Sequence, residues 1–398
     1  MHLKLLLNII LIGFLISSCS KNKVQQSIEN PSRDNSSLPH LFTDNKGIIF
    51  MSWVEQDKEL ATLLYSKFLD KSWGAPILVD QSNEWFVNWA DYPSIIAFDG
   101  DPMATHWLKK IPGNTYSYNV EIAPYLNDQF LNSIVPHTDN TATEHGFVSM
   151  TPTSDSTFYT IWLDGRNTIG GHDEHGDLSS SMTLRGALLS LDGQILSEAE
   201  LDASVCDCCN TSIAKTNSGL IAAYRNRTEN EVRDIYISKY VNGVWQSPKS
   251  IFNDNWQIAA CPVNGPSIDV FDKSVAVAWF TGANDKPMVK LAFSLDEGDS
   301  FLTPIIIDST STLGRVDVIA NNDKTAWVSW MSRNTNGGQL NLRQVSINGE
   351  TIAEFVISDM NPSRGSGFPQ ITSSNDGILV AWTELSGSSK SIKTAFIQ

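Results

Sequence analysis

Short apolar runs that end in an aromatic residue recur along the chain. Their continuous β-branched, aromatic and small apolar residues favour strands over helices. The runs occupy residues 48–53, 103–107, 159–162, 220–224, 275–279, 326–330 and 378–382. Their terminal aromatic residues follow one another at intervals of 51 to 62 residues. A period of this length indicates a repeat architecture.

Each run belongs to a larger unit of four short strands. Another apolar run precedes it, as at 266–270 and 315–319, and two more follow it, as at 288–294 and 303–307. Such units form the blades of a β-propeller, because each twisted sheet buries both faces against its neighbours. The sequence therefore predicts an all-β fold, a single β-propeller of seven four-stranded blades. The alternative is a six-bladed ring with one copy outside it.

One turn carries a family resemblance. Residues 294–301 read Ser-Leu-Asp-Glu-Gly-Asp-Ser-Phe, with degraded copies near Asp70, Asp192, Asn242 and Asn348. The turn resembles the Asp-box, or bacterial neuraminidase repeat, of the sialidase-like β-propellers, over about residues 39–398. Sialidases have six blades, and the resemblance implies glycan recognition or hydrolysis of the exo-sialidase type.

The N-terminus has the pattern of an export signal. Lys4 precedes a short apolar stretch that leads to Ile16-Ser17-Ser18-Cys19, too short to span a membrane. The junction resembles the bacterial lipobox, which implies cleavage after residue 18 and a lipid on Cys19 that anchors the protein in the cell envelope, at the outer membrane or facing the periplasm. An ordinary secretory signal is the alternative.

The polar residues that follow predict a boundary between tether and domain. We expect residues 19–38 to form a flexible tether and residues 39–398 to form the propeller. The last repeat reaches residue 398 after three strands, so its fourth is expected from the N-terminal side, near residues 35–41.

The net charge of the chain argues against one class of partner. The 398 residues include 28 Lys and Arg against 44 Asp and Glu, a formal net charge of −16. Such an acidic chain repels phosphate backbones, so nucleic acid is not expected as a partner.

The candidate chemistry falls on one predicted face. Loops that lead into inner strands (lead-in loops) share a face with the loops that join second and third strands, here called the top face. The cysteines and histidines assigned to it are Cys206, Cys208, Cys209, Cys261, His137, His145, His172 and His175. Two interpretations stay open: structural disulfides, one of them between an upstream cysteine and Cys261, or a copper or zinc site with histidine ligands.

The family resemblance assigns further roles on the top face. Sialidases hold a sugar carboxylate with three arginines and use a Tyr–Glu pair and an Asp in catalysis. Carried over, this implies a triad of Arg225, Arg315 and Arg364 with Asp164 or Asp91 as the acid. The family's Arg-Ile-Pro motif has no counterpart at residues 38–41, and no Tyr–Glu pair is identifiable. Additional ligand contacts are expected from Arg166, Trp85, Trp89 and Trp256.

Two functional hypotheses follow. The first is an envelope-anchored propeller whose top face binds a glycan or other anionic ligand, with hydrolysis of a glycan as an additional activity to be tested. The second is a metal-binding or protein-interaction propeller organised by the Cys/His cluster.

Overall fold

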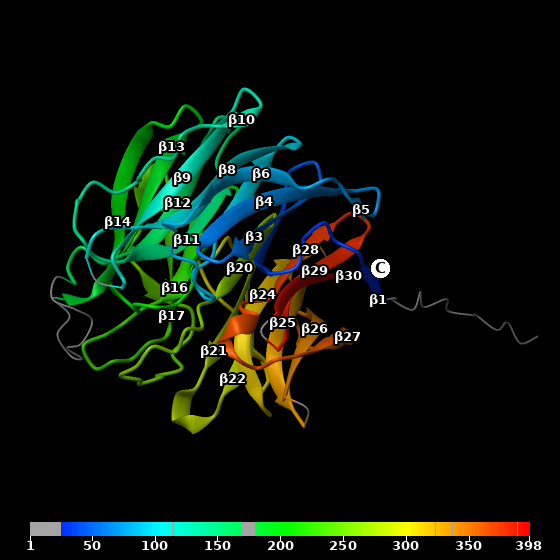
Figure 1. Ribbon diagram of the computed structural model, residues 1–398. Coiled ribbons are helices and arrows are strands. Elements are labelled where there is room, and N and C mark those ends of the chain that lie inside the picture. The colour runs from blue at the N-terminus through cyan, green and yellow to red at the C-terminus, as the bar shows by residue number, and fades with distance from the viewer. Residues whose placement is uncertain (1–24, 114, 169–179, 323, 336, 388) are drawn as a thin grey trace, which may run out of the picture.

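The computed structural model describes residues 25–398 except residues 114, 169–179, 323, 336 and 388. In this part of the chain, seven antiparallel sheets surround a central axis (Figure 1). This arrangement confirms the all-β, seven-bladed propeller, and the six-bladed alternative is wrong. We number the blades 1 to 7 in the chain order of their inner strands.

The two strands nearest the axis form the first hairpin of each blade. The inner strands, in blade order, are β2 (Ser36–Thr43), β7 (Ser94–Phe98), β11 (His145–Pro152), β15 (Ser212–Lys215), β20 (Ser267–Phe271), β24 (Thr312–Ala320) and β28 (Gln370–Ser374). The second strands contain the seven aromatic runs and are β3 (Ile49–Asp57), β8 (Asp101–Lys110), β12 (Thr157–Asp164), β16 (Gly219–Arg225), β21 (Ser274–Thr281), β25 (Thr325–Asn334) and β29 (Gly377–Ser386).

The outer half of each blade is more variable. The third strands are β4 (Leu60–Leu69), β9 (Tyr118–Leu126), β13 (Met182–Ser190), β17 (Ile235–Val241), β22 (Met288–Ser294), β26 (Gly337–Ser346) and β30 (Ser389–Ile397). The outer strands are β5 (Ser72–Trp73) with β6 (Ile77–Ser82), β10 (Gln129–Phe130), β14 (Ile195–Val205), β18 (Val244–Trp245) with β19 (Lys249–Ser250), β23 (Ile305–Asp308), β27 (Thr351–Met360) and, in blade 7, β1 (Gln25–Ile28). Two short 3-10 helices lie in loops, η2 (Ala283–Asp285) and η3 (Arg364–Ser366).

The ring is closed by the N-terminal strand. β1 pairs antiparallel with β30, with Gln25 opposite Ile397 (Figure 1). The fourth strand of blade 7 therefore comes from residues 25–28 and not from 35–41, where β2 is the inner strand of blade 1. β1 and the first residues of β2 lie within the segment 19–38, so the propeller begins earlier than the expected residue 39. The signal segment and Cys19 lie outside the described residues.

Hydrogen bonds join successive inner strands around the axis. At five of the junctions a side chain on one inner strand accepts the backbone N–H of the next, which satisfies a donor that the sheet leaves open. The pairs are Ile95 N–H to His40 Nδ1 (3.4 Å), Ile213 N–H to Ser149 Oγ (3.1 Å), Ile268 N–H to Ser212 Oγ (3.1 Å), Val318 N–H to Ser267 Oγ (3.2 Å) and Ile371 N–H to Asp317 Oδ2 (2.8 Å). These bonds fix the inner ring from which the top-face loops project.

The repeated aromatic residues fill the space between blades. Trp53, Trp162 and Trp279 are at most 1% exposed, and a buried ring of this size contributes a large apolar area to the core. The indole N–H still needs an acceptor. Trp162 donates to Asp164 at 2.9 Å, so this core residue also positions a carboxylate at the top end of its strand.

The best Asp-box forms the expected turn between β22 and β23. Asp296 Oδ1 accepts the Ser294 hydroxyl at 2.7 Å and the backbone N–H of Ser300 at 2.8 Å. Gly298 has φ +84°, a conformation that favours glycine. This turn stabilises the hairpin.

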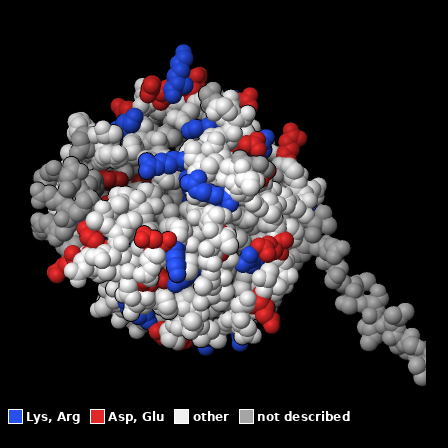
Figure 2. Space-filling model, turned by 90° about the horizontal axis from the view of Figure 1, so that it is seen from below, with Lys and Arg blue, Asp and Glu red and all other residues white. Residues whose placement is uncertain are grey.

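The surface gives two further observations. Among the described residues no helix is both long enough and apolar enough to cross a bilayer. On the face in Figure 2, basic and acidic side chains of the described residues are interspersed, without a continuous basic surface.

Candidate functional site

The lead-in loops of the inner strands meet over one end of the axis. Asn210 Nδ2 donates to the carbonyl of Ala90 at 2.8 Å, joining the loops of blades 4 and 2. Arg315 Nη1 donates to the carbonyl of Gly367 at 3.0 Å, joining blades 6 and 7. These bonds bring residues far apart in the sequence to one surface.

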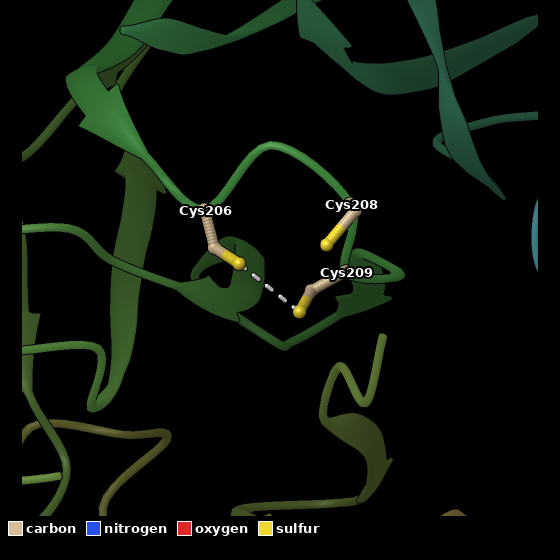
Figure 3. Close-up of side chains that lie close together, drawn as sticks. All are labelled: Cys206, Cys208 and Cys209. Atoms are coloured by element: carbon tan, nitrogen blue, oxygen red, sulfur yellow. Dashed lines mark hydrogen bonds between the residues drawn. The ribbon is translucent and has the colours of Figure 1, made fainter. Parts of the chain in front are cut away.

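Three cysteines gather in the lead-in loop of blade 4. The Sγ atoms of Cys206, Cys208 and Cys209 all lie within 4.8 Å of one another, and their side chains point inward toward a common point (Figure 3). Cys206 Sγ lies 3.2 Å from Cys209 Sγ. Cys261, from the lead-in loop of blade 5, has its thiol hydrogen-bonded to that of Cys208 and is exposed. All four thiols are free.

A buried network of charges surrounds the cysteine cluster. Arg233, 0% exposed, donates to Cys206 Sγ at 3.3 Å and to Glu231 Oε2 at 2.8 Å. The same Glu231 carboxylate accepts a bond from Arg227 at 2.7 Å. Because buried charges are costly unless they are paired and hydrogen-bonded, this network fixes the guanidinium of Arg233 against the sulfur.

The thiols of the cluster differ in pKa. Burial acts to raise the pKa of the Cys206 thiol, but hydrogen bonds from Cys208 and Cys209 and the charge of Arg233 outweigh it and hold this pKa well below its ordinary value. Burial and the neighbouring Cys206 sulfur raise the pKa of the Cys209 thiol. The surroundings therefore favour the thiolate at Cys206 and the neutral thiol at Cys209.

His145 lies in a different cluster, at the top of blade 3. Asp139 accepts a bond from His137 Nδ1 at 3.0 Å and one from His145 Nε2 at 3.2 Å. The two imidazoles stack with centroids 3.8 Å apart. Asp164 is ion-paired to Arg166 Nε at 2.7 Å and lies 3.8 Å from His145. His145 is thus held by carboxylates.

This histidine cluster is also capable of holding a cation, since His137, Asp139 and His145 each direct a donor atom to one point. Burial acts to raise the pKa of the Asp139 carboxyl, but bonds from His137, His145 and Thr141 lower it overall. Burial lowers the pKa of His137. The pKa of Asp164 is also lowered, because the bond and charge of Arg166 outweigh burial. An ionised Asp164 does not suit the role of general acid that the resemblance implied.

A buried Tyr–Glu pair joins the third strand of blade 2 to the lead-in loop of blade 3. Tyr118 Oη donates to Glu144 Oε1 at 2.5 Å. Asp91 accepts the backbone N–H of Phe147 at 2.8 Å, and burial raises the pKa of Asp91 well above its ordinary value. A Cβ at position 146 would lie 2.0 Å from Asp91 Oδ2, so Gly146 permits this close approach.

The sequence could not identify this pair because Tyr118 begins strand β9, whereas Glu144 lies 26 residues later in a lead-in loop. A signal was present in the glycine of Glu144-His145-Gly146, which marks a close backbone approach. Tyr118 is only 1% exposed and stacks on Phe86, so its hydroxyl is covered.

The predicted arginine triad does not assemble. The Arg225 guanidinium donates to the carbonyls of Arg233, Asn264 and Phe280 and is 2% exposed. Its donors are therefore used within the fold. Arg315 and Arg364 do come together, with their Cζ atoms 5.1 Å and 5.8 Å from the ring centroid of Trp89.

Of the three candidate tryptophans, only Trp89 lies at the surface. Trp85 is 5% exposed and stacks on Trp107 in the core. Trp256 is 8% exposed and lies under the Arg225 guanidinium. Half-buried Trp89 stacks on Phe368 with an angle of 14° between the rings. Arg166 pairs with Asp164 of the histidine cluster. His172 and His175 lie outside the described residues.

Trp89 packs against an apolar cluster that contains Phe368 and extends into the core between blades 3 and 4. Half-buried Tyr92, Val263 and Cys208 pack against the same cluster. Below it, a cavity of about 700 Å³ is lined by all seven inner strands. Burial raises the pKa of two acids in its wall, Asp269 to about 7 and Asp317 to about 6.

Comparisons with known proteins identify the fold alone. No family model and no curated protein matches the chain. A crystal structure of a Dyadobacter fermentans protein of unknown function aligns with TM-score 0.52 and 10% identity over 94% of this chain and 97% of the other. AFV00434, an ancestral GH74 enzyme, aligns with TM-score 0.51 and 10% identity over 94% of this chain and 50% of the other.

A mutant of Trypanosoma rangeli sialidase displaying trans-sialidase activity aligns with TM-score 0.45 and 10% identity, over 94% of this chain and 58% of the other. At these identities the structures are similar in their propeller fold, and a shared fold does not determine a function.

Proposed function

We propose that the top face binds the carboxylate of an acidic carbohydrate through Arg315 and Arg364, beside Trp89. One observation supports this most strongly. The two guanidinium groups approach the same indole, yet neither forms an ion pair with a carboxylate among the described residues. Burial, and then the like charge of Arg364, lower the pKa of Arg315 to about 10. An anion placed between these charges is stabilised by both.

The backbone supports the same assignment. Arg315 has φ +53°, in the left-handed region, within an irregular stretch of the β24–β25 pairing. Left-handed backbone at a non-glycine residue is costly and recurs where a side chain is aimed at a ligand. Bonds from Arg315 to the carbonyls of Gly367 (3.0 Å) and Ser363 (3.1 Å) then hold the guanidinium beside the half-buried ring of Trp89.

The choice of a sugar rests on chemistry and on fold analogy. A sugar ring rests well on an apolar and aromatic surface such as Trp89 and Phe368, while its carboxylate pairs with a guanidinium. Glycan-active proteins occur among the propellers to which this chain is similar, including the ancestral GH74 enzyme. This analogy favours a carbohydrate over other anions.

Calorimetric titration tests the proposal. N-acetylneuraminate and glucuronate should bind, and neutral glucose should not. Arg364→Gln should weaken binding by roughly tenfold or more, because a bond between charged groups is lost. Arg333→Gln, which removes the same charge from another exposed arginine, is the matched control. Equal affinities for the acidic and neutral sugars, or equal losses in both variants, would contradict the proposal.

Hydrolysis is a second candidate, favoured by the Tyr118–Glu144 bond with Asp91 beside it. In this assignment Tyr118 is the nucleophile and Asp91, whose raised pKa keeps a proton available, is the acid. A fluorogenic sialoside tests it. Turnover should be lost in Tyr118→Phe and should rise in Phe86→Ala, which uncovers the hydroxyl. No turnover in either the parent protein or Phe86→Ala rejects this candidate.

We also propose that Cys19 anchors the chain to a membrane. Labelled palmitate should enter the expressed protein and be lost in Cys19→Ala. A variant that stays labelled would place the anchor elsewhere.

A further inference from the structure

The cysteine cluster has the dimensions of a thiolate metal site. Sulfurs that share one ion at bonds of about 2.3 Å lie roughly 3.8–4.0 Å apart in tetrahedral or trigonal geometry. Cys206, Cys208 and Cys209 place their sulfurs within 4.8 Å of one another (Figure 3), with the nearest pair at 3.2 Å. Small side-chain rotations are enough to bring all three to bonding distance of one ion.

The surroundings favour anionic sulfur. Arg233 is fully buried and donates to Cys206 Sγ at 3.3 Å. The charges of both Arg233 and Arg225 act on this sulfur. A site that must hold several thiolates needs such compensation, because buried negative charges repel one another. Hydrogen bonds to metal-bound sulfur also orient the ligand.

The loop that carries the cysteines is held before any ligand arrives. Cys206 N–H donates to the carbonyl of Arg225 at 2.9 Å. On the far side of the loop, Asn210 Nδ2 donates to the carbonyl of Ala90. The backbone N–H of Arg233 in turn donates to the carbonyl of Trp256 at 2.9 Å, which fixes the backbone that carries the guanidinium. Ligands held on both sides lose little freedom on binding, which raises affinity.

Exposure separates Cys261 from the other three. Cys206 and Cys209 are 0% and 2% exposed, Cys208 is half-buried and Cys261 is exposed. Cys261 contacts Cys208 and is not a member of the three-sulfur group. Burial therefore increases from the exposed Cys261 through Cys208 to Cys206 and Cys209.

We propose that Cys206, Cys208 and Cys209 bind one Cu⁺ ion in trigonal coordination, and that Cys261 is the surface thiol through which the ion enters. Three soft ligands in a largely dry site suit Cu⁺, whereas structural Zn²⁺ takes a fourth ligand. On binding, the ion replaces the protons of the thiols, which leave to solvent. No electron transfer is involved.

The test uses the reduced full-length protein without oxygen, titrated with Cu⁺ against bathocuproine disulfonate. One Cu⁺ per chain should bind. Cys209→Ser should abolish competitive binding, while Cys261→Ser should keep the affinity and slow the loading. Arg233→Lys, which keeps the charge but loses the planar fork, should weaken affinity by about tenfold.

A measurement on the parent protein removes any dependence on how the variants fold. After Cu⁺ loading, alkylation and peptide mapping should find Cys261 modified and the other three protected. Protection of all four, with Zn²⁺ bound as one ion per chain, would overturn the trigonal copper assignment. So would a Cys206–Cys209 or Cys208–Cys261 disulfide in the exported protein, together with no metal uptake after reduction.

Discussion

The cysteine cluster and the histidine cluster occupy related positions in adjacent blades, but their charged groups are paired in different ways. In blade 3, Asp139 and Asp164 face His137, His145 and Arg166, so acids and bases alternate and satisfy one another. In blade 4, Arg233 divides its donors between a carboxylate and a sulfur. The first cluster is built from acids and bases that pair with one another, and the second is built around sulfur.

This difference shows that lead-in loops at equivalent positions of two blades can hold different chemical groups. Both clusters lie near the start of an inner strand, where lead-in loops converge. Their properties then depend on a few side chains, because the propeller supplies the same frame to each.

The largest contrast should come from removing the central arginine of each cluster. Arg233→Met removes one of the two arginines that pair with the buried Glu231 carboxylate, so the free energy of unfolding should fall by about 3–5 kcal/mol. Arg166→Met should cost less, because the Arg166 side chain is 18% exposed and water can reach Asp164 in its place. Urea unfolding measures both. Equal losses would remove the distinction between the clusters.

A smaller effect should appear with pH in the histidine cluster alone. Burial lowers the pKa of His137 below its ordinary 6.5, so the unfolded chain binds this proton more tightly than the folded chain. The stabilisation is present above about pH 6.5 and is lost as pH falls through that value. The wild type should therefore lose more stability than His137→Gln between pH 7.5 and 5.5.

Comparing the two proteins at each pH cancels the opposite contribution of Asp269, whose raised pKa favours the folded state in acid. Parallel curves for wild type and His137→Gln would show that His137 does not titrate differently in the two states.

The smallest effect is expected at the outer edge of blade 3. Arg185 pairs with Glu200 at 2.8 Å, and the Glu200 side chain is 40% exposed. Solvent screens this pair, so Glu200→Gln should change the free energy of unfolding by about 0.5 kcal/mol or less. A loss comparable to that of Arg233→Met would mean that exposure does not explain the contrast between the clusters.

The architecture was predictable because every repeat shows the same pattern of apolar residues that indicates a buried strand. Seven aromatic runs at a nearly constant interval require seven equivalent strands, whatever their loops contain. The convergence of Cys206, Cys208 and Cys209 with Cys261 follows from the same topology, since successive inner strands are neighbours. The N-terminal strand was misplaced because Gln25–Ile28 is short and polar, with little pattern to mark it.

The contacts of individual side chains were less predictable. Arg225 and Arg364 look alike in the sequence, yet the first caps backbone carbonyls and the second is exposed beside Trp89. His145 was expected near the cysteines, but Asp139, six residues earlier in its own lead-in loop, holds it. Such choices depend on loop geometry and on competition among partners, which periodicity does not encode.

The pairing of β1 with β30 has a consequence for biosynthesis. Gln25 is synthesised long before Ile397, the residue opposite it. β1 must therefore remain unpaired until β30 has been made. Contacts so distant in sequence form slowly. The ring can close only once β30 is available, so completing blade 7 is a late folding step.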